Sequence, residues 1–135
     1  MMKWMHRKEM EPSIQGAVCV IDRDHGIQNS ISVLLGTLGV AVVTFTTAEE
    51  FLSRADYERP ALIITELSLP GMSGFELKNK LDQKGIKIPT VGLTGEANPR
   101  DEREASHAGF LELIEKPFVS RAVVEQVKTT LGIPR

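Results

Sequence analysis

A chain of 135 residues with 41% hydrophobic and 25% charged residues has the composition of one globular domain with a single core. Its formal charge of −2 gives no electrostatic basis for binding DNA or RNA, and its single cysteine, Cys19, excludes an internal disulfide. No apolar run approaches the roughly 18 residues of a membrane span, and the first residues lack the apolar segment of a secretory signal. We therefore expect a cytoplasmic protein.

Residues 1–15 have the composition of an N-terminal tail, either flexible or a short helix. They hold four of the five methionines and the only tryptophan, Trp4, among charged residues. The alternative is a short helix that docks on a partner through Trp4 and Met5. The globular domain is expected over 16–132, and 133–135 form its C-terminal end.

Two strand-and-helix units are predicted in the first part of this domain. The apolar run AVCVI, at 17–21, predicts a buried strand. A helix that stops near Gly39 is predicted from apolar residues at helical spacing, namely Ile27, Ile31, Leu34, Leu35 and Leu38. The run VAVVTF, at 40–45, predicts a second strand. Thr47 and Glu50 then have the spacing of a capping box that opens a short helix.

Three further units follow in the same order. The run ALIIT, at 61–65, predicts a third strand, and a capping box of Ser73 and Glu76 opens a helix to about Lys84. The run IPTVGL, at 88–93, predicts a fourth strand, and the next helix begins at Asn98–Pro99 and ends at Gly109. The run LELI, at 111–114, predicts the fifth strand. The last helix begins near Ser120 and is expected to bury Val123, Val124, Val127 and Leu131.

The alternation of strands and helices with short connections predicts a parallel sheet with right-handed crossovers. Because most of the strands are continuous apolar runs, we expect helices on both faces of the sheet. The predicted fold is a three-layer α/β sandwich, doubly wound and flavodoxin-like, with five strands. Of the orders available to such a sheet, 2-1-3-4-5 is the expected one.

Polar side chains follow four of the five predicted strands. Asp22 and Arg23 follow the first strand, Glu66 the third, Thr94 the fourth and Lys116 the fifth. Ligands of open α/β sheets bind at the carboxyl ends of the strands, at the switch point that lies between the first and third strands in this order. The sequence therefore predicts a site at this edge of the sheet.

The motifs that carry these residues resemble the response-regulator receiver domain of two-component signalling, in the branch typified by nitrogen-fixation regulators. They are VIDRD, LIITELSLPGMSGFEL, GLTGE and IEKPF, and the resemblance covers the chain from Ala17 to about Leu131. In that family an aspartate after the third strand takes a phosphoryl group from a sensor histidine kinase. Two acids after the first strand help to hold Mg²⁺, and a hydroxyl and a lysine contact the phosphoryl oxygens.

Carried over by position, Asp22 matches the first acid, and Thr94 and Lys116 are the residue types that the family uses. Arg23 stands in place of the second acid, and Glu66 stands at the phospho-acceptor position. Leu113 replaces the aromatic residue that, together with the hydroxyl, forms the switch in this family, and it is interpreted as core filler. The resemblance also implies a cis peptide bond between Lys116 and Pro117.

These changes bring the formal charge of the pocket from −2 in the family to 0, because Asp22 and Glu66 face Arg23 and Lys116. A guanidinium can bind a carboxylate with two parallel hydrogen bonds, and an ion pair at ~4 Å attracts by roughly 4 kcal/mol at an effective dielectric constant of ~20, before desolvation. We hypothesise a metal-free ion-pair cluster that makes phosphoryl transfer to Glu66 slow or absent. The longer acid would partly mimic a phosphorylated aspartate, or simply lock one conformation.

The sequence thus predicts an atypical pseudo-receiver with no enzymatic activity, no cofactor and no direct contact with nucleic acid or membrane. Protein partners are expected, either a sensor histidine kinase or an output protein, and a homodimer would use the fourth helix, fifth strand and fifth helix. One alternative is a weakly phosphorylatable receiver in which Asp22 and Glu66 recruit Mg²⁺. A remote alternative is a flavin- or nucleotide-binding protein, which the two acids of DRDHGIQ disfavour. Cys19 is expected to be buried and inert, and the histidines are expected to be solvated.

Overall fold

Five parallel strands form one sheet in the order β2-β1-β3-β4-β5 in the computed structural model. The structure describes residues 13–54, 57, 59–117 and 120–134. The strands are β1 (Val18–Ile21), β2 (Val42–Phe45), β3 (Leu62–Glu66), β4 (Thr90–Thr94) and β5 (Glu112–Glu115). The predicted fold class and strand order are confirmed.

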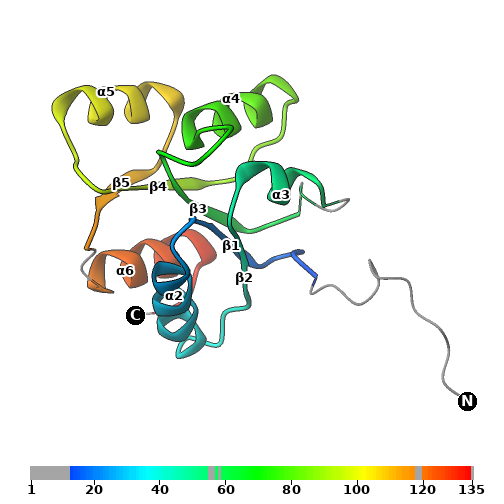
Figure 1. Cartoon of the computed structure of the whole chain (residues 1–135). Coiled ribbons are helices and arrows are strands. Elements are labelled where there is room, and N and C mark those ends of the chain that lie inside the picture. The colour runs from blue at the N-terminus through cyan, green and yellow to red at the C-terminus, as the bar shows by residue number, and fades with distance from the viewer. Residues whose placement is uncertain (1–12, 55–56, 58, 118–119, 135) are drawn as a thin grey trace, which may run out of the picture.

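Helices cover both faces of this sheet, as Figure 1 shows. On one face lie α2 (His25–Gly36) and α6 (Ser120–Leu131), and on the other lie α3 (Ala48–Leu52), α4 (Gly74–Gln83) and α5 (Pro99–Ala108). Alternate residues of β1 serve the two cores: Cys19 and Ile21 pack toward α3 and α4, whereas Val18 and Val20 pack toward α2 and α6. None of the helices in the described ranges is long and apolar enough to cross a membrane.

The helix ends follow the predicted capping signals at most positions. Ser73 and Glu76 form a full capping box at the start of α4, and Asn98 caps α5 before Pro99. Gly109 ends α5 with φ +86, a left-handed conformation that glycine adopts without steric cost. Gly39 also has a positive φ, of +73, but α2 has already ended at Gly36 and a short turn intervenes.

The predicted capping box at α3 is only half present. The Thr47 side chain accepts the backbone N–H of Glu50, but the Glu50 carboxylate accepts the N–H of Thr46 instead of that of Thr47. Thr46 follows the last paired residue of β2, so its N–H lies beyond the sheet and needs another acceptor. The Glu50 carboxylate is that acceptor, so it binds the N–H one residue before the N-cap residue Thr47.

Several predicted boundaries shift by one or two residues. Glu66 and Thr94 are the last residues of β3 and β4, and β5 extends to Glu115. In α6, Val123 and Val127 are buried as predicted, whereas Val124 and Leu131 are half-buried. The predicted tail is too long at its inner end, because Ile14 is fully buried in the core beside Cys19. Residues 1–12 of that tail, which include Trp4 and Met5, lie outside the described residues.

Candidate functional site

The ends of β1, β3 and β5 bring three charged side chains together, although these residues are far apart in the sequence. Lys116 follows β5 and its Nζ lies 2.7 Å from Asp22 Oδ2 and 3.3 Å from Glu66 Oε1. The Asp22 side chain is fully buried, the Glu66 side chain is 9% exposed and the Lys116 side chain is 16% exposed. A single ammonium group therefore bridges two buried carboxylates.

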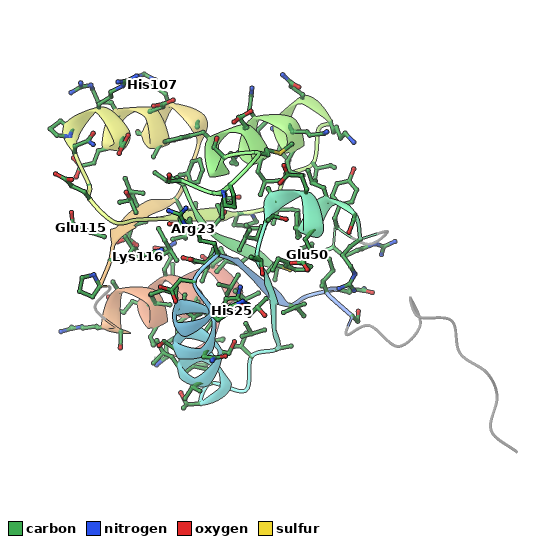
Figure 2. The ribbon with its side chains drawn as sticks, in the orientation of Figure 1. Arg23, His25, Glu50, His107, Glu115 and Lys116 are labelled. Carbon is green, nitrogen blue, oxygen red and sulfur yellow. The ribbon has the colours of Figure 1, made fainter. Side chains whose placement is uncertain are left out.

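Arg23 joins this cluster from the outside. Its Nε lies 3.7 Å from Glu66 Oε2, and 58% of its side chain is exposed. At that distance the contact is an ion pair without a hydrogen bond, so the two-toothed pairing considered from the sequence does not form. Figure 2 shows Arg23 and Lys116 at the same edge of the sheet, on the β1–α2 loop and after β5. We call Asp22, Arg23, Glu66 and Lys116 the ion-pair cluster.

Local structure fixes the direction of the Asp22 carboxylate. Its Oδ1 accepts the backbone N–H of Asp24, and Asp24 in turn caps α2 by accepting the N–H groups of Gly26 and Ile27. This arrangement leaves Oδ2 to face Lys116. Although Oδ2 and the Lys116 Nζ are close, their geometry is not that of a hydrogen bond, so Asp22 Oδ2 accepts none.

The cluster does not fit a divalent cation well. Mg²⁺ prefers about six oxygen ligands in octahedral geometry, usually with one or two carboxylates among them. Asp22 Oδ2 and Glu66 Oε2 are buried and accept no hydrogen bond, but the first faces an ammonium group and the second a guanidinium. In the described ranges, no three His, Cys, Asp or Glu side chains are grouped to hold a metal ion.

Thr94 lies at the same edge but is engaged with its own loop. Its hydroxyl donates to the backbone carbonyl of Glu96 at 3.2 Å, and that hydroxyl oxygen also lies 3.4 Å from the N–H of Glu96. The loop is tied a second time, because the Glu115 carboxylate accepts the N–H of Ala97 at 2.7 Å. Glu115 was not singled out from the sequence, and as an exposed acid beside Lys116 it carries no distinguishing pattern.

Leu113 occupies the space that Gly92 leaves open on the neighbouring strand. It is half-buried and packs with Leu67, Ala105 and Phe110. A Cβ added at Gly92 would lie 3.0 Å from Leu113 Cδ1 and 3.1 Å from Leu67 Cδ2. The side chain is therefore half-buried among apolar residues, and its interpretation as core filler stays a prediction.

The loop after Glu66 is held from two sides. Gly74, the first residue of α4, donates its N–H to the carbonyl of Leu67 at 2.9 Å. From α3, the Glu49 carboxylate accepts the N–H of Met72 at 2.9 Å, and this hydrogen bond lowers the pKa of the exposed Glu49 carboxyl. Gly71 beside it has φ +73, and a side chain there would collide with that carboxylate.

The remaining candidates lie apart from the cluster. Cys19 is buried inside β1, and His25 and His107 are exposed, as expected, with His107 on the outer side of α5 in Figure 2. His6 lies outside the described residues. The peptide bond between Lys116 and Pro117 is cis, as the resemblance implies.

Gln28 is a second polar residue near the cluster that the sequence analysis did not identify. It is 6% exposed, and its side-chain amide donates to the carbonyls of Asp22 and Phe45. A signal was present, because Gln28 precedes Ile31 by three residues and Leu35 by seven, so it occupies a core-facing position of α2.

Comparison with known proteins identifies the family to which this chain is similar. The profile of the response regulator receiver domain matches residues 18–128. The transcriptional regulatory protein FixJ of Azorhizobium caulinodans is 33% identical over 115 residues, which are 85% of this chain and 54% of that protein. The chain thus spans about half the length of the FixJ proteins it matches.

Solved structures agree with this assignment. The crystal structure of FixJ-N is 31% identical, with a TM-score of 0.76 over 88% of this chain and 95% of that one. The BeF3-activated DrrB receiver domain is 26% identical, with a TM-score of 0.78 over 87% of this chain and 98% of that one. The family profile matches most of the chain, and the relatives and the β2-β1-β3-β4-β5 sheet agree with it. The chain therefore belongs to the response regulator receiver domain family.

Proposed function

We propose that this receiver domain acts in two-component signalling as a pseudo-receiver, through protein–protein interaction and without ordinary phosphorylation. The observation that carries the proposal is the environment of Glu66. Its carboxylate stands at the end of β3, is bridged to Asp22 by Lys116 and is approached from outside by Arg23. The cations of the protein itself neutralise the acids that a receiver would otherwise offer to a metal ion.

Two physical effects oppose phosphoryl transfer to Glu66. Glutamate places its carboxylate one methylene farther from the backbone than aspartate, and a misplacement of ~1 Å can cost about a hundredfold in rate. The charge of a transferring phosphoryl group also needs neutralisation, which metal ions supply in many phosphoryl transfers. Here Arg23 stands near Glu66 Oε2, where its positive charge disfavours a divalent cation.

The proposed module presents one conformation to its partner. Thr94 is bonded to its own loop, that loop is tied to Glu115, and Leu113 is packed inward. Candidate partners are a sensor histidine kinase or an output protein. The face formed by α5, β5 and α6, which corresponds to the fourth helix, fifth strand and fifth helix of the sequence analysis, is the proposed surface for a homodimer.

Incubation with acetyl phosphate and Mg²⁺, followed by intact-mass spectrometry, tests the proposal. We expect no stoichiometric mass gain for the wild-type protein. A gain of one phosphoryl group that disappears in Glu66→Ala would contradict the proposal and support the alternative, a weakly phosphorylatable receiver that uses Mg²⁺ at Asp22 and Glu66. A receiver domain with aspartate at the acceptor position, treated in parallel, checks the reagent.

A converse experiment restores what the substitutions removed. The double variant Arg23→Asp, Glu66→Asp replaces a guanidinium by a carboxylate and shortens the acid at the end of β3. We expect it to bind Mg²⁺ in a titration followed by NMR and to gain a phosphoryl group from acetyl phosphate. Each single variant is the matched control, because either change alone leaves one obstacle in place.

A further inference from the structure

A glutamine side chain is buried where the β1–α2 loop begins. Gln28 lies in the first turns of α2, and its Nε2 donates to the carbonyl oxygen of Asp22 at 2.6 Å and to that of Phe45 at 3.1 Å. Both protons of the amide group are therefore engaged. The side chain is directed toward the sheet instead of toward solvent, although glutamine is seldom fully buried.

The Asp22 carbonyl needs this donor because sheet pairing stops there, whereas the Phe45 carbonyl receives a second donor. Phe45 is the last paired residue of β2, and its carbonyl already accepts the N–H of Asp22 at 3.0 Å. Asp22 follows the last residue of β1 and is fully buried, so water cannot satisfy its carbonyl. A buried carbonyl without a donor is costly, and Gln28 supplies the donor that the Asp22 carbonyl would otherwise lack.

These bonds fix the backbone from which half of the ion-pair cluster projects. The carbonyl of Asp22 is held by Gln28, and the Oδ1 of Asp22 is held by the N–H of Asp24. With its backbone and one carboxylate oxygen fixed, Asp22 directs Oδ2 toward Lys116. Arg23 is the next residue, so the same anchored peptide sets where the guanidinium begins.

We infer that Gln28 is a positioning residue for the ion-pair cluster, which acts by holding the peptide of Asp22 against the ends of β1 and β2. The inference rests on the cluster described in the proposed function, but not on whether Glu66 accepts phosphate. Both hydrogen bonds of the Gln28 amide go to backbone carbonyls, so its effect reaches the charged groups through the backbone. This role differs from that of a residue that only fills the core between α2 and the sheet.

A double-mutant cycle between Asp22 and Lys116 separates these two roles. The cycle uses Asp22→Asn, Lys116→Met and the double variant. Urea unfolding of these variants and of the wild type gives the coupling free energy between the two side chains. The cycle is then repeated in the Gln28→Leu background, which introduces an apolar side chain of similar size and removes both donors. We expect the coupling to fall to about half or less, because misplaced partners interact less.

Ile31→Val is the matched control for this experiment. Ile31 is a buried residue of the same helix that packs in the core without a hydrogen bond to the loop, so its variant should lower stability and leave the coupling unchanged. If Gln28→Leu does not fold, Gln28→Met, which is longer and more flexible, takes its place.

The outcomes distinguish this inference from the proposed function. An unchanged Asp22–Lys116 coupling in the Gln28 background would overturn the inference, as would the absence of any coupling in the wild-type background. Neither result bears on the acetyl phosphate experiment. Conversely, phosphorylation of Glu66 would overturn the proposed function. A reduced Asp22–Lys116 coupling free energy in the Gln28→Leu background would still support the positioning role of Gln28.

Discussion

Two sides of the same sheet edge differ in how their polar groups are satisfied. On the acid side, Asp22 and Glu66 depend on one ammonium group, which comes from a residue 50 positions away from Glu66. On the hydroxyl side, Thr94 is satisfied by Glu96, two residues farther along its own loop. The contacts of Lys116 on the acid side are thus tertiary, whereas the hydrogen bond of the Thr94 hydroxyl is local.

This difference indicates which substitutions should change the stability of each side most. A charge that is buried and left without its partner destabilises a protein strongly, whereas a lost hydrogen bond near the surface costs much less. The acid side should therefore respond to loss of charge. The hydroxyl side should respond to changes of volume, because Gly92 and Leu113 fit closely against each other.

The largest effect is expected for Lys116→Met. The variant leaves two carboxylates buried without their cation, and loss of one partner of a buried pair typically costs about 3–5 kcal/mol. Urea unfolding measures the change. Lys87→Met, at an exposed position, is the matched control. A loss below about 1 kcal/mol would show that the cluster is solvated, and adding Asp22→Asn to the Lys116→Met variant should recover part of the stability.

An intermediate effect is expected for Gly92→Ala on the hydroxyl side. The added methyl group meets Leu113 and Leu67 at close range, and overpacking of this kind costs about 1–3 kcal/mol. Adding Leu113→Ala should relieve part of that cost, which thermal unfolding of the single and double variants would detect. Gly95→Ala is the control, since its new Cβ would have no atom within 4 Å. Equal stability of the two alanine variants would mean that Leu113 moves aside freely.

The smallest effect is expected for Arg23→Gln. Because the Arg23 side chain is 58% exposed and its Nε lies 3.7 Å from Glu66 Oε2, the pair should contribute only about 0.2–1 kcal/mol. Salt screens such a pair, so the difference from wild type should shrink between low and high ionic strength in urea unfolding. Arg103→Gln, at an exposed position of α5, controls for the change in net charge. A salt-independent loss of several kcal/mol would place Arg23 with the buried half of the cluster.

The fold was predictable because the signals along this chain agree with one another. Apolar runs gave the strands, and capping residues such as Ser73 and Asn98 gave the helix starts. The convergence of Asp22, Glu66 and Lys116 followed from one rule, that the carboxyl ends of parallel strands share an edge. Their contacts at 2.7 and 3.3 Å are consistent with that reasoning.

What the sequence did not reveal depends on side-chain direction. Glu50 pairs with Thr46, and Gln28 points toward the sheet. Both arrangements depend on which backbone group lacks a hydrogen-bond partner after folding. The geometry of Arg23 is similar, since an exposed side chain with many rotamers is not restricted by pattern or spacing. Ile14 was assigned to the tail because one isolated apolar residue carries no periodicity.

The contact between Gly74 and Glu66 has a mechanical consequence. A Cβ at Gly74 would lie 2.5 Å from the carbonyl oxygen of Glu66, so the first residue of α4 rests directly against the backbone of the acid. No Gly74 side chain separates the two segments at this point. A displacement of the Glu66 peptide is therefore expected to push on the first residue of α4.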